Sequence, residues 1–209
     1  MKIKSILAII IILVGFTVSA FVYNNTPEKM IMRWGFDGEP TAYWTKDFGL
    51  FFLPVLSIAI FGLMTIIPSL DPLKKNITKF NKEYQNFVLI VVGFMVYLHI
   101  GTIVMNFTNE FQIGQILAPG FALLLYSVGN LLEKAKRNWF IGIRTPWTLS
   151  SDRVWKKTHE LGATLFRGCG VVSLLGLVLP QASFFIIIVP ILIATIVLFV
   201  YSYLEFRKN

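Results

Sequence analysis

The polar chemistry of this 209-residue chain is concentrated in one connector, the stretch NWFIGIRTPWTLSSDRVWKKTHELG, which runs from Asn138 to Gly162 between long apolar segments. Its HELGA segment begins like the zinc-binding HExxH pattern, but Ala163 occupies the position of the second histidine, so the zinc ligand set fails. The sequence has no phosphate-binding loop, no GxSxG motif and no cysteine–histidine pair at a recognisable spacing. We therefore expect no enzyme activity and no metal or cofactor, and the single cysteine, Cys169, excludes a disulfide within the chain.

The middle of this connector contains a turn followed by the start of a helix. Pro146 restricts Thr145 to an extended backbone, so we expect TPWTL to form a loop. Ser150 or Ser151 can then cap a helix that starts at Asp152, whose carboxylate is favourable in the first turn. This helix can continue directly into the next apolar segment.

The helix after the serines is expected to be weakly amphipathic. Its apolar face recurs at spacings of three and four residues and consists of Val154, Trp155, Thr158 and Leu161. The pattern predicts a short interfacial helix with Trp155 in the lipid headgroups. It does not explain why four residues occur together just before it, namely Arg144, Thr145, Pro146 and Trp147.

The elements that position this connector are predicted to be membrane spans. The chain is 56% hydrophobic and 14% charged, whereas about 25% of residues are charged in ordinary globular domains. Six apolar blocks are each about long enough to cross a hydrocarbon core of ~30 Å as a helix, roughly 5–23, 48–67, 87–106, 113–132, 162–179 and 184–204. Because lipid cannot pair free backbone groups, we predict an all-α polytopic bundle of six transmembrane helices. We divide it into an N-terminal membrane domain with an outer loop, 1–86, and a C-terminal membrane domain, 87–209.

The distribution of lysine and arginine predicts the orientation of the bundle. Six spans place successive connectors on opposite sides of the membrane. The side that has both termini then holds 15 of these cations and the other side holds 3, with Arg167 left near the start of a span. The positive-inside rule then places both termini and the tryptophan-rich connector in the cytoplasm. The first apolar block is longer than a usual signal-peptide core, so we expect it to be retained as a span. Because these connectors and the lipid headgroups account for the net charge of +8, we expect no direct contact with nucleic acid.

Two features outside the connector are further candidate sites. His99 lies in the middle of the third apolar block, where an ionisable group is costly. It can be a neutral, hydrogen-bonded structural residue, or it can act as a relay or a ligand. The first outer connector, NNTPEKMIMRWGFDGEPTAYWTKD, combines turn formers with amphipathic aromatic residues and can form a folded cap at the outer interface. Alternatively it can bind an extracellular ligand, and its carboxylates at Asp37, Glu39 and Asp47 would favour a cationic one.

The segment IGIRTPWTLSSDRVWKKTHELGATLFRGCG resembles the signature of the SdpI-like family, the immunity proteins for the bacterial sporulation-delaying toxin. PEKMIMRWGFDGEPTAYWTK and PSLDPLKKN resemble a small domain of unknown function that often precedes this signature. Together these motifs extend from Pro27 to Gly170. The resemblance makes seven residues candidates for interaction with a partner or toxin: Arg144, Thr145, Pro146, Trp147, Ser150, Trp155 and His159.

The resemblance implies a multi-pass protein of the bacterial plasma membrane that confers toxin immunity and transmits a signal. The best-understood relative protects its host from a secreted peptide toxin and, when toxin is present, holds a small helix-turn-helix autorepressor at the membrane. We therefore expect a secreted peptide toxin, such a repressor and the lipid bilayer as partners. A small peptide transporter or permease is the alternative, because six spans, Pro54 and Pro190 within spans, and His99 also fit that function.

Overall fold

A computed structural model describes residues 2–108 and 111–208 of the chain. The predicted membrane bundle is confirmed, since six helices in the described part of the chain are long and apolar enough to cross a membrane. They are α1 (Lys2–Val22), α2 (Lys46–Leu70), α4 (Asn81–Phe107), α5 (Ile113–Lys134), α7 (Asp152–Ser173) and α8 (Ser183–Arg207). Each apolar block forms a helix because a helix pairs its own backbone groups where lipid offers no partners.

Shorter elements connect the long helices. They are η1 (Tyr23–Asn25), β1 (Lys29–Trp34), β2 (Pro40–Thr45), α3 (Lys74–Ile77), η2 (Thr78–Phe80), α6 (Pro146–Ser150), η3 (Leu174–Leu177) and η4 (Pro180–Ala182). The helix α7 begins at Asp152 and continues into the membrane, as the sequence indicated. The cap of this helix is also confirmed, because the Ser151 hydroxyl accepts a hydrogen bond from the Val154 backbone N–H at 3.4 Å.

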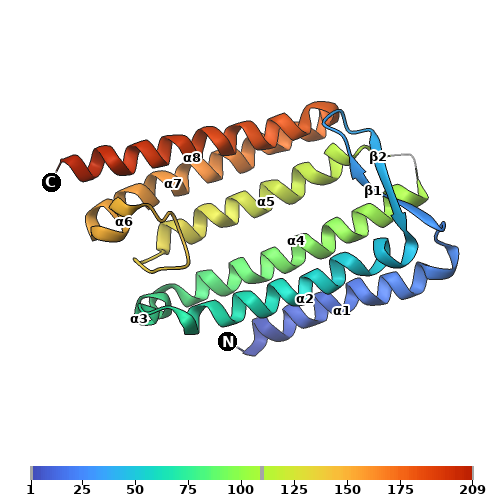
Figure 1. Ribbon diagram of the computed structural model, residues 1–209, viewed down its shortest axis with the longest axis horizontal. Coiled ribbons are helices and arrows are strands. Elements are labelled where there is room, and N and C mark those ends of the chain that lie inside the picture. Colours follow the sequence, from blue (N-terminus) through green and yellow to red (C-terminus); the bar gives the residue numbers. More distant parts are fainter. Residues whose placement is uncertain (1, 109–110, 209) are drawn as a thin grey trace.

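The six long helices form two groups of three. Helices α1, α2 and α4 pack against one another, helices α5, α7 and α8 form the second group, and α4 packs against α5 to join them (Figure 1). Helix α1 begins and α8 ends at the same end of the bundle, where α3 and α6 also lie (Figure 1). We call this the terminal end, and the opposite end, which carries β1 and β2, the hairpin end. The domain boundary at residue 86 and the cytoplasmic placement of the terminal end stay predictions.

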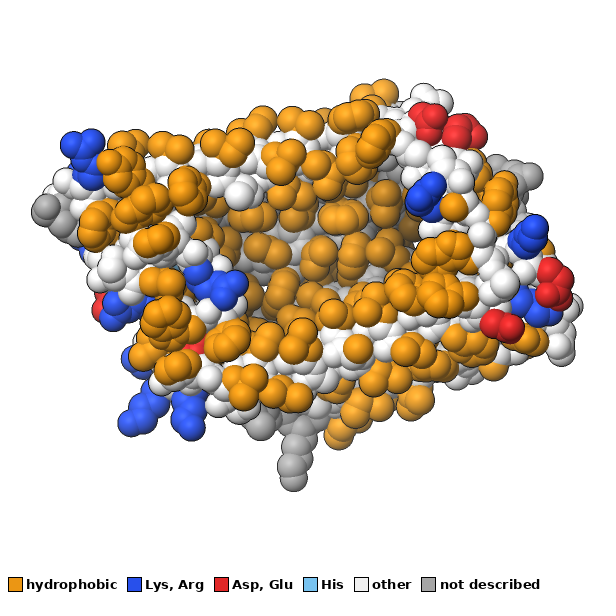
Figure 2. All heavy atoms as spheres, in the orientation of Figure 1, with side chains coloured by type: hydrophobic (Ala, Val, Ile, Leu, Met, Phe, Trp, Pro, Cys, Tyr) orange, Lys and Arg blue, Asp and Glu red, His pale blue; other side chains and the backbone are white. Residues whose placement is uncertain are grey.

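The surface of the bundle is apolar along its length. In the view of Figure 2, hydrophobic side chains cover the helices, while charged side chains gather toward the two ends. An apolar band between two charged ends matches a lipid core between two aqueous layers. The chain is therefore a multi-pass membrane protein.

The connector between α1 and α2 folds into an antiparallel β-hairpin, an element that the all-α prediction did not include. Gly38 has a positive φ of 86°, which suits the tight turn between the strands. The side chain of Met30 is buried against Leu50. The side chain of Asn106 in α4 accepts a hydrogen bond from the Ile31 N–H at 2.7 Å and donates one to the Ile31 carbonyl at 3.1 Å. The hairpin is thus fixed to the helices beneath it.

Candidate functional site

The connector between α5 and α7, residues 135–151, folds over the terminal end of the bundle (Figure 1). Residues 135–145 have no regular secondary structure, and α6 follows them. A segment without helix or strand must pair its backbone groups by other means when it is buried. The side chains that do so define the site.

Asn138 organises the first half of the connector. Its side chain is fully buried, and its amide NH₂ donates to the carbonyls of Lys136 and Ile141, both at 2.8 Å. Its amide oxygen accepts from the N–H groups of Phe140 at 2.9 Å and Ile141 at 2.6 Å. One side chain therefore satisfies four backbone groups and holds the loop in a single shape.

Trp155 and His159 form the base under this loop. The indole N–H of Trp155 donates to the Ala135 carbonyl at 2.9 Å, and the two rings stack with centroids 4.0 Å apart. The His159 Nε2 atom accepts a hydrogen bond from the Ile143 N–H at 3.0 Å. The ring proton must then lie on Nδ1, which donates to the Trp155 carbonyl at 2.8 Å, so His159 is neutral.

The prediction that Trp155 lies among the lipid headgroups is wrong. Its side chain is 3% exposed, because the connector and the end of α5 cover this face of α7. The apolar face of α7 therefore packs against protein instead of lipid.

The prediction that TPWTL forms a loop is also wrong, because residues 146–150 form the short helix α6. Thr145 has the expected extended backbone and caps this helix, since its hydroxyl accepts from the Thr148 N–H at 3.2 Å. The Thr148 hydroxyl accepts in turn from the Thr145 N–H at 2.9 Å. Pro146 is the first helical residue, a position where proline loses no hydrogen bond. The Thr145 hydroxyl also lies 3.1 Å from the Ser202 hydroxyl, which links α6 to α8.

Four of the seven predicted residues remain accessible on top of this base. Arg144, Pro146 and Ser150 are exposed, and Trp147 is half-buried. The indole of Trp147 packs against two aromatic rings of α8, and its ring centroid lies 5.1 Å from the centroids of both Phe199 and Tyr203. We call Arg144, Pro146, Trp147 and Ser150 the connector surface. The structure thus divides the predicted set into this surface and three buried residues, Thr145, Trp155 and His159.

The other predicted site residue, His99, is not part of the connector. It lies in α4, is fully buried, and its Nε2 atom is 2.8 Å from the Ser19 hydroxyl of α1. The same hydroxyl donates to the Leu50 carbonyl of α2 at 2.6 Å. His99 therefore sits in a polar contact that ties α1, α2 and α4 together.

Two acidic residues that sequence reasoning missed tie the connector region to other helices. Asp71, after α2, is buried and accepts from the Trp139 N–H at 2.8 Å. Glu205 in α8 is 1% exposed and forms ion pairs with Arg153 at 2.9 Å and Lys157 at 3.1 Å, both in α7. The signal in the sequence was weak, a single carboxylate at the end of each of two apolar segments. Among the described residues, no group of three or more His, Cys, Asp or Glu side chains is placed to hold a metal ion.

Gly142 is required by the close approach of the connector to His159. It has a φ of +118°, and a Cβ atom at this position would lie 2.4 Å from the His159 Nε2 atom. We expect Gly142→Ala to lower the unfolding free energy by about 2–3 kcal/mol, because alanine is strained at this φ and would break the Ile143–His159 hydrogen bond. Denaturant titration in detergent micelles measures the change.

Gly168→Ala is the matched control, because a Cβ atom at that position of α7 would have no atom within 4 Å other than those of its chain neighbours and of its own helix backbone. A Gly142→Ala protein as stable as the Gly168→Ala protein would contradict the proposed steric requirement.

Comparison with known proteins gives three findings. Residues 134–202 match the sequence model of the SdpI/YfhL protein family. Residues 10–58 match the model described as a domain of unknown function, DUF1648. The protein named Immunity protein SdpI from Bacillus subtilis (strain 168) is 27% identical over 206 residues, which cover 98% of this chain and 97% of that protein. No solved structure matches the chain.

Proposed function

Because this chain is an SdpI-like membrane protein with a DUF1648 segment ahead of its SdpI segment, we propose that it protects its cell against a secreted peptide toxin. We propose further that it signals the presence of toxin by holding a helix-turn-helix repressor at the connector surface. The observation that carries the proposal is the division of the signature residues into a rigid buried base and an accessible surface.

The chemistry of the connector surface supports protein docking. The Arg144 guanidinium carries five N–H donors, and its Nη1 donates to the Trp139 carbonyl at 2.7 Å. This bond orients the guanidinium and leaves donors for a partner's carboxylate or carbonyl. Trp147 presents a large, rigid apolar area beside it, and tryptophan and arginine are the residues that most often dominate binding energy in protein interfaces.

The links between the two helix groups support a signalling role. Asp71 binds the Trp139 N–H, and the Asn76 amide of α3 donates to the Arg137 carbonyl at 2.8 Å. A movement of α2 relative to α5 would therefore disturb the connector directly. Toxin must bind the repressor-docking state more tightly than the other state, and a ~100-fold preference corresponds to about 2.7 kcal/mol of coupling.

Substitution of the connector surface tests the proposal. We expect Trp147→Ala and Arg144→Ala to weaken recruitment of a fluorescently tagged candidate repressor to the membrane by tenfold or more, because each removes an interface anchor. Survival of a toxin-sensitive bacterium that expresses each variant, exposed to the sporulation-delaying toxin, measures immunity in parallel. Recruitment in toxin-treated cells, measured by microscopy, reports the signalling step.

Trp139→Ala is a useful control, because this tryptophan is 51% exposed and lies in the same connector but outside the connector surface. It should retain recruitment and survival. If the Arg144 and Trp147 variants insert normally and match the unmodified protein in both measurements, the connector surface is not the docking site.

A further inference from the structure

Helix α2 contains two prolines, and each leaves one backbone carbonyl of the helix without its usual partner. Proline carries no N–H, so Pro54 cannot bond the Leu50 carbonyl four residues before it. Pro68 likewise cannot bond the Met64 carbonyl. An unpaired carbonyl is costly away from water, so each of these two carbonyls needs a donor from outside the α2 backbone.

The Leu50 carbonyl is paired by α1. The hydroxyl of Ser19, a fully buried residue, donates to this carbonyl at 2.6 Å. Helix α1 lies directly against the proline, since a Cβ atom at Gly15 would be 3.7 Å from the Pro54 ring. The same hydroxyl has a second acceptor in its own helix, the Gly15 carbonyl at 3.1 Å. Ser19 can therefore release α2 without leaving its own hydroxyl unpaired.

His99 of α4 completes this contact, because its Nε2 atom lies 2.8 Å from the Ser19 hydroxyl oxygen. The hydroxyl proton goes to a carbonyl, so Nε2 carries the ring proton and donates it to Ser19. The Nδ1 atom is buried and has no hydrogen-bond partner among the residues that the structure describes, so a second ring proton would be unpaired there and the ring is neutral. The bond from His99 to Ser19 is thus compatible with either carbonyl acceptor, and it keeps α1 and α4 joined when α2 is released.

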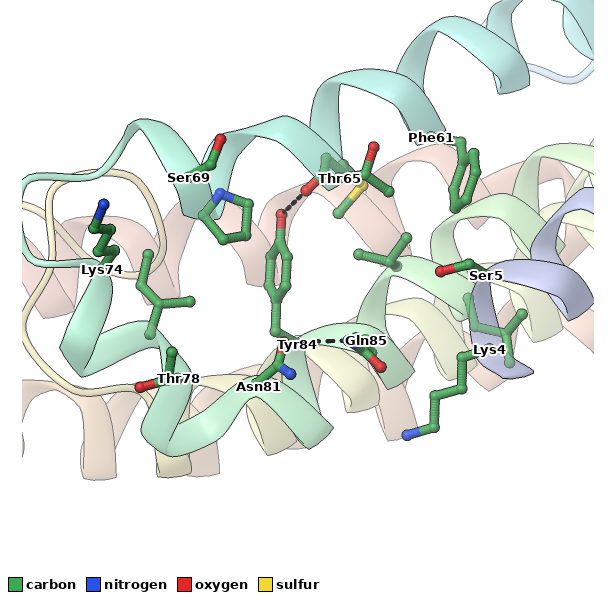
Figure 3. A pocket seen from close by; sticks show the side chains of 15 residues that line it. Lys4, Ser5, Phe61, Thr65, Ser69, Lys74, Thr78, Asn81, Tyr84 and Gln85 are labelled. Carbon is green, nitrogen blue, oxygen red and sulfur yellow. Dashed lines mark hydrogen bonds between the residues drawn. The ribbon is translucent and has the colours of Figure 1, made fainter. Parts of the chain in front are cut away.

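The Met64 carbonyl is paired by α4. Figure 3 shows the Tyr84 side chain reaching from α4 toward α2, where its hydroxyl donates to this carbonyl at 2.6 Å. Tyr84 is buried in the core cluster at the terminal end, and its hydroxyl forms no other hydrogen bond within residues 2–108 and 111–208. The contact at Pro68 therefore has one arrangement, whereas the contact at Pro54 has two.

We propose that α2 is a hinged helix in which the Ser19–Leu50 hydrogen bond is a releasable latch at Pro54 and Tyr84 is the fixed point about which α2 moves. The far end of α2 leads to Asp71, which binds the Trp139 N–H of the connector at 2.8 Å. Leu50 and Asp71 are about 30 Å apart along the helix. The latch thus links the hairpin end of the bundle to the connector. Its use in signalling rests on the proposed function, but the latch itself does not.

A cavity at the hairpin end is placed to operate the latch. It has a volume of about 340 Å³ and lies between the hairpin and helices of both groups. Phe52 and Leu53, which directly precede Pro54, belong to its lining. Thr102 lines it one turn after His99. A molecule that enters this cavity would therefore press on the segment of α2 that the latch holds.

The coupling between Ser19 and Pro54 tests the latch. Ser19→Ala removes the donor, and Pro54→Ala supplies a backbone N–H that can pair the Leu50 carbonyl instead. We expect Ser19→Ala to speed amide exchange of residues 51–58 about tenfold in the otherwise unmodified chain, the effect of one net hydrogen bond, and by less than about twofold in the Pro54→Ala chain. Hydrogen–deuterium exchange mass spectrometry of the full chain in detergent micelles measures both. His99 loses its partner in both chains, so that effect cancels.

Thr17→Ala is the matched control. Thr17 is an exposed residue of α1 near Ser19, and its hydroxyl donates to the Leu13 carbonyl of its own helix at 2.9 Å. Its variant should leave exchange in α2 unchanged. Tyr84→Phe gives an independent arm at the other proline: it should speed exchange of residues 65–70, and by less in a Pro68→Ala chain.

Exchange in the connector reports the transmission. Ser19→Ala should also speed exchange of residues 138–143, because Asp71 moves with α2 and loosens the Trp139 N–H. The proposal is overturned by an equal effect of Ser19→Ala with and without Pro54, by an equal effect of Thr17→Ala, or by an unchanged connector. These measurements use neither toxin nor repressor, so their outcome is distinct from that of the recruitment and survival assays.

Discussion

Replacement of Trp155 by alanine is expected to lower the unfolding free energy by about 3–5 kcal/mol, the usual cost of truncating a fully packed tryptophan. The side chain is 3% exposed, stacks on His159 and gives its N–H to the Ala135 carbonyl. The substitution removes this packing and leaves the carbonyl without its partner. Denaturant titration in detergent micelles gives the change, and the survival assay should show loss of immunity with it.

Trp139→Ala separates the effect of burial from that of residue type. Trp139 lies in the same connector, but its side chain is 51% exposed, so its loss should cost less than about 1 kcal/mol. Trp155→Phe should recover part of the stability, because phenylalanine keeps the ring stack and loses the hydrogen bond. If the Trp155→Ala and Trp139→Ala proteins have the same unfolding free energy, the buried contacts of Trp155 do not stabilise the terminal end of the bundle.

Replacement of Asn138 by alanine is expected to cost a similar amount, about 3–5 kcal/mol. Its amide makes four hydrogen bonds to backbone groups in a fully buried position, and each group left unpaired there costs about 1–3 kcal/mol before the loop relaxes. The loop that leads to Arg144 would lose its fixed shape. We therefore expect repressor recruitment to fall together with stability.

Asn130→Ala is the matched control for Asn138. Asn130 is exposed on α5 and accepts a hydrogen bond from Arg167 at 2.9 Å, so its loss should change the unfolding free energy by less than about 1 kcal/mol. Asn138→Asp gives a second comparison: aspartate keeps the acceptor for Phe140 and Ile141 but turns an oxygen toward two carbonyls. An Asn138→Ala protein that unfolds like the unmodified chain would contradict the role of this residue in holding the loop.

Local signals in the sequence were sufficient for the helices and for one of their caps. The six spans follow from the length and hydrophobicity of each block, and both properties belong to the segment itself. The Ser151 cap depends on a residue three positions away, which the sequence displays directly. The same local reasoning missed α6, because the rule that proline disfavours a helix before it was weighed above its preference for the first helical position.

The sequence by itself determined the membrane bundle, the apolar face of α7 and the segment in which the candidate site lies, since these depend on residues that are neighbours along the chain. Only the tertiary structure decided which signature residues are buried and which remain accessible. Trp155 is buried because the Ala135 end of α5, 20 residues away in the chain, covers it, and the Trp139 N–H finds its acceptor in Asp71, 68 residues away. Contacts over such separations are set by how the helices pack, and the hydrophobic pattern of a single segment does not contain that information.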